Sequence, residues 1–118
     1  MIETRTEELN GLPVLKFLEK EHEEFLGAVY PYSLESATEL CEEAKKILKG
    51  ERTSELRMDQ ESGSIVIDGN EVTIFNSFTE DEKYRFGYYK TSEILPILKK
   101  WVLVINQNTK LREKKRIN

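Results

Sequence analysis

The side chains best suited to chemistry in this sequence are one histidine, one cysteine and several carboxylates. Glu19 and His22 have the i, i+3 spacing that places two metal ligands on one helical turn. A di-metal helical bundle needs a second such motif, and the sequence has neither that motif nor a second histidine. The sequence therefore predicts no metal site and no bound cofactor.

The cysteine and the adjacent carboxylates fit structural roles better than catalytic ones. Cys41 falls on the apolar side of a predicted helix, where a thiol packs as a small hydrophobic group. Glu42 and Glu43 are neighbours in the sequence, so on a helix they point about 100° apart and cannot flank one scissile bond. No glycine-rich stretch leads from a predicted strand into a helix, as a phosphate-binding loop requires. We therefore expect no enzymatic activity and no small-molecule substrate.

Two helices are predicted in the first half of the chain. Residues 10–27 carry apolar side chains near helical spacing, and Pro13 would lie in the first turn, where its missing N–H is tolerated. Ser33 is a suitable cap for a second helix, which Gly50 would end. Between these two residues the apolar side chains follow the i, i+3, i+4, i+7 pattern closely.

Strands are predicted beyond Gly50, because apolar and polar residues there alternate. The turn sequence Asp68-Gly69-Asn70 predicts an antiparallel hairpin between residues 64–67 and 71–75. Residues 84–88 alternate in the same way, with Tyr84, Phe86 and Tyr88 on one face, and Thr91 or Ser92 would cap a last helix.

This order predicts an α+β fold with two N-terminal helices, an antiparallel β-meander of three or four strands and a C-terminal helix packed on the sheet. The chain has 118 residues, which suits one domain. We expect that domain to cover residues 1–109. Residues 110–118 carry five bases and one acid, and we expect them to form a basic, flexible tail.

Negative charge is concentrated in the predicted helices. Residues 1–50 hold eleven acidic and six basic side chains, whereas residues 51–118 hold eleven and twelve. A solvated helix face often looks like this, but a surplus of carboxylates also speeds encounter with a basic partner. The predicted partner-binding residues are six carboxylates and three tyrosines that would serve as exposed anchors: Glu19, Glu23, Glu35, Glu39, Glu42, Glu43, Tyr30, Tyr32 and Tyr89.

The closing stretch, residues 89–101, reads as a short strand followed by a capped helix with an apolar pair and a late Trp101. Together with the acidic helices and the meander, it resembles small immunity proteins of bacterial polymorphic or contact-dependent toxin systems. That resemblance implies a cytoplasmic protein without catalytic activity, which binds the toxin of its own system, usually a nuclease, and blocks it.

An alternative is a nucleic-acid-associated accessory or regulatory protein that acts through the basic residues 110–118. Residues 1–109 hold 21 acids and 13 bases, a net charge of −8 that would repel a polyanion, so nucleic acid is the weaker expectation. No apolar run is long enough for a membrane span, and the first residues lack the layout of a secretory signal. The sequence leaves open whether two copies of the chain form a homodimer.

Overall fold

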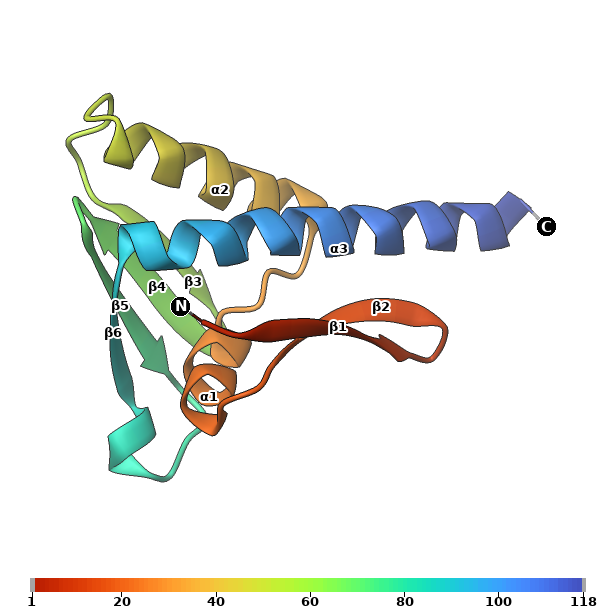
Figure 1. Cartoon of the computed structure of the whole chain (residues 1–118), viewed down its shortest axis with the longest axis horizontal. Helices are drawn as coiled ribbons and strands as arrows, with labels where there is room; N and C mark the ends of the chain where they lie inside the picture. The colour runs from red at the N-terminus through yellow and green to blue at the C-terminus, as the bar shows by residue number, and fades with distance from the viewer. Residues whose placement is uncertain (1, 118) are drawn as a thin grey trace.

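The computed structural model describes residues 2–117, with side chains over residues 2–114. A β-hairpin, two helices, a four-stranded sheet and a long closing helix follow one another along the chain (Figure 1). In chain order the elements are β1 (Thr4–Leu9), β2 (Leu12–Phe17), α1 (Lys20–Ala28), α2 (Leu34–Leu48), β3 (Leu56–Gln60), β4 (Gly63–Asp68), β5 (Glu71–Asn76), the 3-10 turn η1 (Glu82–Tyr84), β6 (Phe86–Lys90) and α3 (Thr91–Ile117). The α+β class and a closing helix packed on the sheet are thus confirmed.

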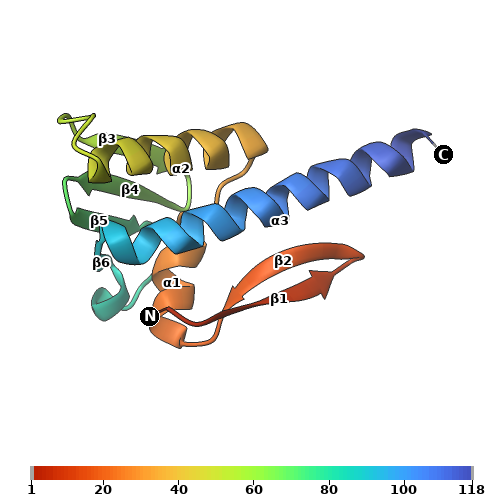
Figure 2. The same ribbon diagram turned by 45° about the horizontal axis from the view of Figure 1, so that its top comes forward.

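The main sheet is an antiparallel meander with the strand order β3-β4-β5-β6. β4 and β5 are joined through Gly69-Asn70, with Asp68 opposite Glu71, which confirms the predicted hairpin. The helices lie on one face of this sheet (Figures 1 and 2). That face carries the buried residues of β4 and β5, which alternate along each strand: Ile65, Ile67, Val72 and Ile74.

The prediction of a helix over residues 10–27 is wrong for its first half, which belongs to a hairpin. Asn10 and Gly11 have φ angles of 53° and 80° and form the two-residue turn between β1 and β2. A type I′ turn needs positive φ at both central residues, and Asn-Gly is its preferred sequence. The turn preference therefore outweighs the apolar spacing, and only Lys20–Ala28 is helical.

Pro13 fits this hairpin because the ladder does not need its nitrogen. The N–H of Leu18 donates to the carbonyl of Glu3 at 3.2 Å. Hydrogen-bonded pairs in an antiparallel ladder recur at every second residue, so the pair of Glu8 and Pro13 is a non-hydrogen-bonded one. The proline costs no hydrogen bond there.

The second predicted helix is confirmed as α2. The hydroxyl of Ser33 accepts the N–H of Ser36 at 3.1 Å, and Gly50 follows the helix with a φ of 76°. The apolar side of α2 packs against α3, which runs antiparallel to it (Figures 1 and 2).

Tyr84 lies in η1, so β6 begins two residues later than predicted, at Phe86.

The start of α3 is fixed by contacts with the turn between β4 and β5. Thr91 is fully buried, and its N–H and hydroxyl donate to the carbonyls of Asn70 and Gly69 at 3.2 and 2.6 Å. These bonds attach the start of α3 to the sheet.

α3 is longer than predicted and continues to Ile117. Residues 110–117 of the predicted flexible tail are therefore described as its last turns, and Asn118 lies outside the described residues. This end of α3 extends beyond α2 and runs above the β1–β2 hairpin (Figure 1). Leu111 lies close to the turn of the hairpin, where it lines a shallow groove with Gly11 and Pro13.

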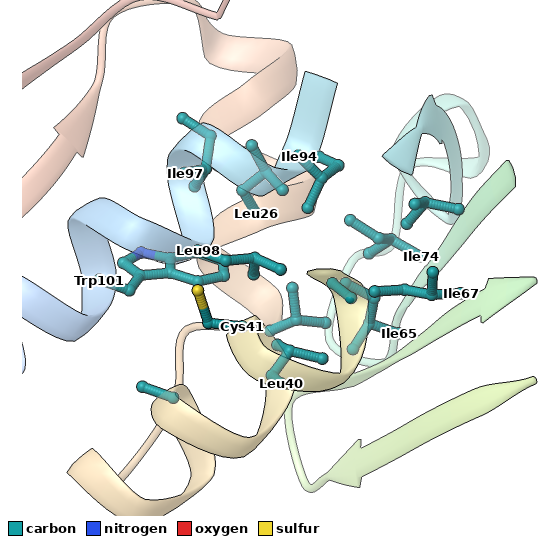
Figure 3. Packing of buried hydrophobic residues seen from close by; sticks show 14 of the residues in the cluster. Leu26, Leu40, Cys41, Ile65, Ile67, Ile74, Ile94, Ile97, Leu98 and Trp101 are labelled. Atoms are coloured by element: carbon teal, nitrogen blue, oxygen red, sulfur yellow. The ribbon is translucent and has the colours of Figure 1, made fainter. Parts of the chain in front are cut away.

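The core lies between the inner face of the sheet and the three helices, and Trp101 lies on the side of it that is farther from the sheet (Figure 3). The Trp101 ring lies 6.3 Å from the Phe17 ring in an edge-to-face arrangement and 5.4 Å from the Tyr30 ring. Cys41 is 3% exposed in the same cluster, as expected of a core thiol.

Candidate protein-binding surfaces

The six predicted carboxylates do not form one continuous acidic surface. Glu19 and Glu23 belong to the α1 region, and the other four lie on α2. α1 and α2 lie on opposite sides of α3 (Figures 1 and 2). Charge that looks contiguous in the sequence is therefore divided between two parts of the molecule.

Several of these carboxylates already have a charged or ionisable partner. Glu23 lies 3.7 Å from the ammonium of Lys16, and Glu42 lies 3.0 Å from that of Lys45. Glu19 lies 3.8 Å from the Nε2 atom of His22. Exposed pairs of this kind contribute little to stability, but each one lowers the net charge available to a partner.

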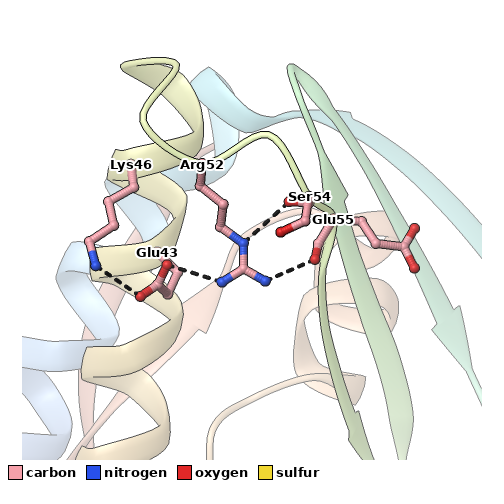
Figure 4. A network of polar contacts seen from close by, with 5 residues as sticks. All are labelled: Glu43, Lys46, Arg52, Ser54 and Glu55. Carbon is pink, nitrogen blue, oxygen red and sulfur yellow. Dashed lines mark hydrogen bonds and ion pairs between the residues drawn. The ribbon is translucent and has the colours of Figure 1, made fainter.

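Glu43 holds a loop in place. One of its carboxylate oxygens accepts from Lys46 and the other from Arg52, each at 3.1 Å (Figure 4). Arg52 also donates to the carbonyls of Ser54 and Glu55, at 3.2 and 2.9 Å, so it ties the segment between α2 and β3 to the helix. The hydrogen bonds from Arg52 and then Lys46 lower the pKa of Glu43 below its usual value. This carboxylate is engaged within the fold.

Two of the predicted carboxylates remain without an ion pair among residues 2–114. Glu35 and Glu39 are exposed and lie one helical turn apart on α2. Tyr32 precedes the helix by two residues and is 73% exposed, with its hydroxyl 3.4 Å from that of Ser62. We refer to Tyr32, Glu35 and Glu39 as the α2 patch.

The other two predicted anchors are half-buried and take part in internal contacts. The hydroxyl of Tyr30 accepts the N–H of Leu15 at 3.3 Å. The hydroxyl of Tyr89 lies 2.8 Å from the Nδ1 atom of His22, and its ring packs edge-on against Phe25. Burial raises the pKa of both phenols, and for Tyr89 the nearby acidic side chains raise it further. Only Tyr32 keeps the free position predicted for an anchor.

The outer face of the main sheet carries aromatic residues that were not among the predicted site residues. Phe86 and Tyr88 on β6 are 51% and 74% exposed, and the Phe86 ring lies 5.3 Å from that of Phe75. A groove of about 300 Å³ crosses this face and is lined by Arg57, Ser64, Val66, Thr73, Phe75 and Phe86. The signal in the sequence is a strand that is aromatic on its solvent side, where polar residues are usual.

The described residues contain no group of three or more His, Cys, Asp or Glu side chains that could hold a metal ion. His22 faces Tyr89 and Glu19, and Cys41 is buried, with a thiol pKa that burial raises. None of the helices in this part of the chain is both long enough and apolar enough to cross a membrane.

Comparison with protein-family models, with curated proteins and with solved structures finds no match for this chain.

Proposed function

We propose that this chain is a non-catalytic, immunity-type protein that binds and neutralises a cognate basic toxin domain, a nuclease, through the α2 patch. The observation that carries the proposal is the position of Tyr32, which is 73% exposed next to two carboxylates without ion pairs. An aromatic anchor beside free charge is the arrangement that protein interfaces favour.

The chemistry of the partner follows from the charge of the patch. A nuclease must present cationic side chains to hold phosphates, and these side chains attract a carboxylate surface at long range. Among residues 2–114, Glu35 and Glu39 have no paired cation to release before they can make such contacts. Tyr32 would supply apolar contact area and one hydroxyl.

The first test reverses both free carboxylates of the patch. Glu35→Lys with Glu39→Lys should lower the association rate with the toxin by about tenfold or more at low salt, because steering charge is lost. Where a large toxin gene lies immediately upstream of this gene, its product is the toxin to use. Stopped-flow mixing at several ionic strengths measures the rate, and circular dichroism checks that the variant is folded.

A matched control changes the net charge equally at another place. Glu3→Lys with Glu8→Lys alters two exposed carboxylates of the β1 region that have no ion pair among residues 2–114. This variant should associate almost as fast as the unchanged protein. If both double variants slow association equally, the effect comes from net charge alone, and the α2 patch is not the binding surface. An association rate that does not depend on salt would contradict electrostatic docking.

A second candidate function is nucleic-acid binding through the end of α3. The observation in its favour is that the helix extends past α2 with Lys110, Arg112 and Lys114 exposed. Bases on a projecting helix can approach phosphates while the acidic body stays at a distance.

The two functions are separated by neutralising this end of the helix. Lys110→Gln, Arg112→Gln and Lys114→Gln together should leave toxin inhibition intact under the immunity-type function. Under the second function, the triple variant should lose most of its affinity for a labelled DNA duplex or RNA. The slope of log affinity against log salt should then fall by about one unit for each phosphate that the variant no longer neutralises. Fluorescence anisotropy over a salt series distinguishes the two results.

A further inference from the structure

The two edges of the main sheet differ in how they are protected. β3 carries an exposed ion pair between Arg57 and Asp59, with Glu55 before the strand and Glu61 after it. Charged side chains on an edge strand hinder pairing with another strand. β6 has no charged residue from Phe86 to Tyr89, and its solvent side is aromatic. Charged residues stand only at its ends, Arg85 and Lys90, so β6 is the less protected edge.

The hydrogen bonds of β6 identify which of its backbone groups are free. The N–H of Asn76 donates to the carbonyl of Arg85, and the N–H of Thr91 donates to that of Asn70. Bonded pairs recur at every second residue, so Arg85, Gly87 and Tyr89 face β5 while Phe86, Tyr88 and Lys90 face outward.

The outward N–H of Lys90 is already used, which leaves the outward N–H groups of two residues of β6. The N–H of Lys90 donates to the carboxylate of Glu93 at 3.0 Å. Phe86 and Tyr88 therefore present the free N–H and C=O groups of this edge. They are separated by Gly87, and a copy of the strand turned by 180° presents the same two residues in reverse order.

This spacing suits antiparallel pairing of β6 with a second copy of itself. With Phe86 opposite the partner's Tyr88, two residue pairs exchange four backbone hydrogen bonds and satisfy all the free groups. Gly87 then lies opposite the partner's Gly87 at a non-hydrogen-bonded position, where backbones come closest and side chains would crowd. On the outer face, Phe86 and the partner's Tyr88 form a cross-strand aromatic pair.

The charges at the two ends of β6 are complementary under the same rotation. At the end near Tyr84, the ammonium groups of Lys20 and Lys83 lie 5.6 and 5.0 Å from the ring centroid, and Arg85 is adjacent. Two acids, Asp81 and Glu82, lie within 4.0 Å of Lys83 and Arg85, which leaves Lys20 as the base here that has no ion pair among residues 2–114.

The opposite end of β6 carries more acidic than basic side chains. Glu19 lies next to His22, whose ring contacts the hydroxyl of Tyr89, and Glu21 directly precedes His22. The carboxylate of Glu93 accepts the N–H of Lys90. With Glu71, which lies opposite Lys90 in the ladder, four acids surround one base at this end. In the register above, Arg85 lies opposite the partner's Tyr89, so each basic end meets an acidic end.

A groove next to this acidic end can receive the partner's side chain. It has a volume of about 550 Å³ and is lined by Asn70, Glu71, Val72, Thr73, Tyr88, Tyr89, Lys90 and Glu93. The register places the partner's Arg85 opposite Tyr89, one of the residues that line this groove. Each copy offers the same groove, so the contact occurs twice, as in an isologous interface.

We propose that two copies of this chain form a two-fold symmetric dimer in which β6 pairs with β6 and the two sheets join into one. The proposal does not depend on the function proposed above. The hydroxyl of Tyr32 lies near Ser62, in the turn between β3 and β4, so the α2 patch is at the other edge of the sheet and stays free in the dimer.

The experiment measures the mass of the protein over a concentration series by analytical ultracentrifugation. The unchanged chain should approach twice its mass of 13.8 kDa as concentration rises. Tyr88→Pro removes the outward N–H without touching the bonds to β5, and Tyr88→Lys adds a charge to the edge. Each should weaken dimerisation at least about tenfold. Val66→Lys is the matched control, since it adds the same charge to the same face on β4, two strands away from the edge and outside the groove that faces the partner, and should still dimerise.

Hydrogen exchange identifies the surface that is buried. The amides of Phe86 and Tyr88 should become protected as concentration rises, whereas those of β3 should not change. A protein that stays monomeric at every concentration overturns the proposal. So does a dimer whose Phe86 and Tyr88 amides exchange freely, or one that both Tyr88 variants leave intact. If Tyr88→Pro fails to fold by circular dichroism, Tyr88→Lys decides alone.

Discussion

Trp101→Ala is expected to lower the free energy of unfolding by about 3 to 5 kcal/mol, the range for removing a large buried aromatic side chain. Trp101 has no exposed surface and joins parts of the chain that are far apart in sequence. Its ring contacts Phe17 of β2 and Tyr30 of the α1–α2 connection, and it shares the core cluster with Cys41 of α2 (Figure 3). The variant leaves a cavity where these elements meet.

Trp101→Phe is the control for this prediction. The indole Nε1 atom is buried and has no hydrogen-bond partner among residues 2–114, so phenylalanine gives up no hydrogen bond to the protein. We expect this variant to cost less than half as much as Trp101→Ala. Urea unfolding followed by far-ultraviolet circular dichroism measures both, because each variant removes the only tryptophan. Equal costs would mean that the indole N–H contributes more than its packing.

Gly63→Ala is expected to destabilise the fold by about 3 kcal/mol, at the upper end of the range for overpacking. A Cβ atom at this position would overlap the carbonyl oxygen of Phe75 and come within 3.2 Å of Ala28. The overlapping atom belongs to the backbone of β5, so it can give way only by distorting the ladder between β4 and β5. The glycine is required by this close approach.

Gly27→Ala is the control, because the two glycine substitutions should change the stability of the protein in opposite directions. A Cβ atom at Gly27 meets nothing within 4 Å, and the residue lies exposed inside α1. Alanine should therefore stabilise the protein by about 0.5 to 1 kcal/mol through helix propensity. Thermal unfolding should place the two variants on opposite sides of the unchanged protein. If Gly63→Ala lies at or above the unchanged protein, the close packing of β4 against β5 and α1 is not as described.

The elements that could be predicted from the sequence are those with local signals at both ends. Ser33 and Gly50 bound α2, and Gly69-Asn70 fixes the β4–β5 hairpin, because a cap or turn depends only on nearby residues. Over residues 10–17 the prediction of a helix is wrong, because Pro13 and the apolar spacing favour a helix, whereas Asn10-Gly11 decides the structure. That dipeptide is a strong hairpin signal, so this part of the fold was predictable from the sequence.

The site residues were less predictable, because exposure depends on contacts distant in sequence. Tyr89 meets His22, which is 67 positions earlier, and Glu43 meets Arg52, which belongs to the next loop. Nothing local to Tyr30, Tyr32 or Tyr89 distinguishes the exposed ring from the two half-buried ones. The open edge of β6 likewise follows only from the strand order, which places no fifth strand beside it among the described residues.

The hairpin at the start of the chain rests on the helix at its end, and this has a consequence for synthesis on the ribosome. Leu15 and Phe17 are buried against α3, and Lys100 donates to the hydroxyl of Thr4 across 96 positions at 2.9 Å. The hairpin, which is translated before α3, thus waits for that helix before its apolar side chains are covered. Nascent chains halted before Trp101 should carry an undocked hairpin that chaperones can bind, and native structure should arise only once translation of α3 is nearly complete.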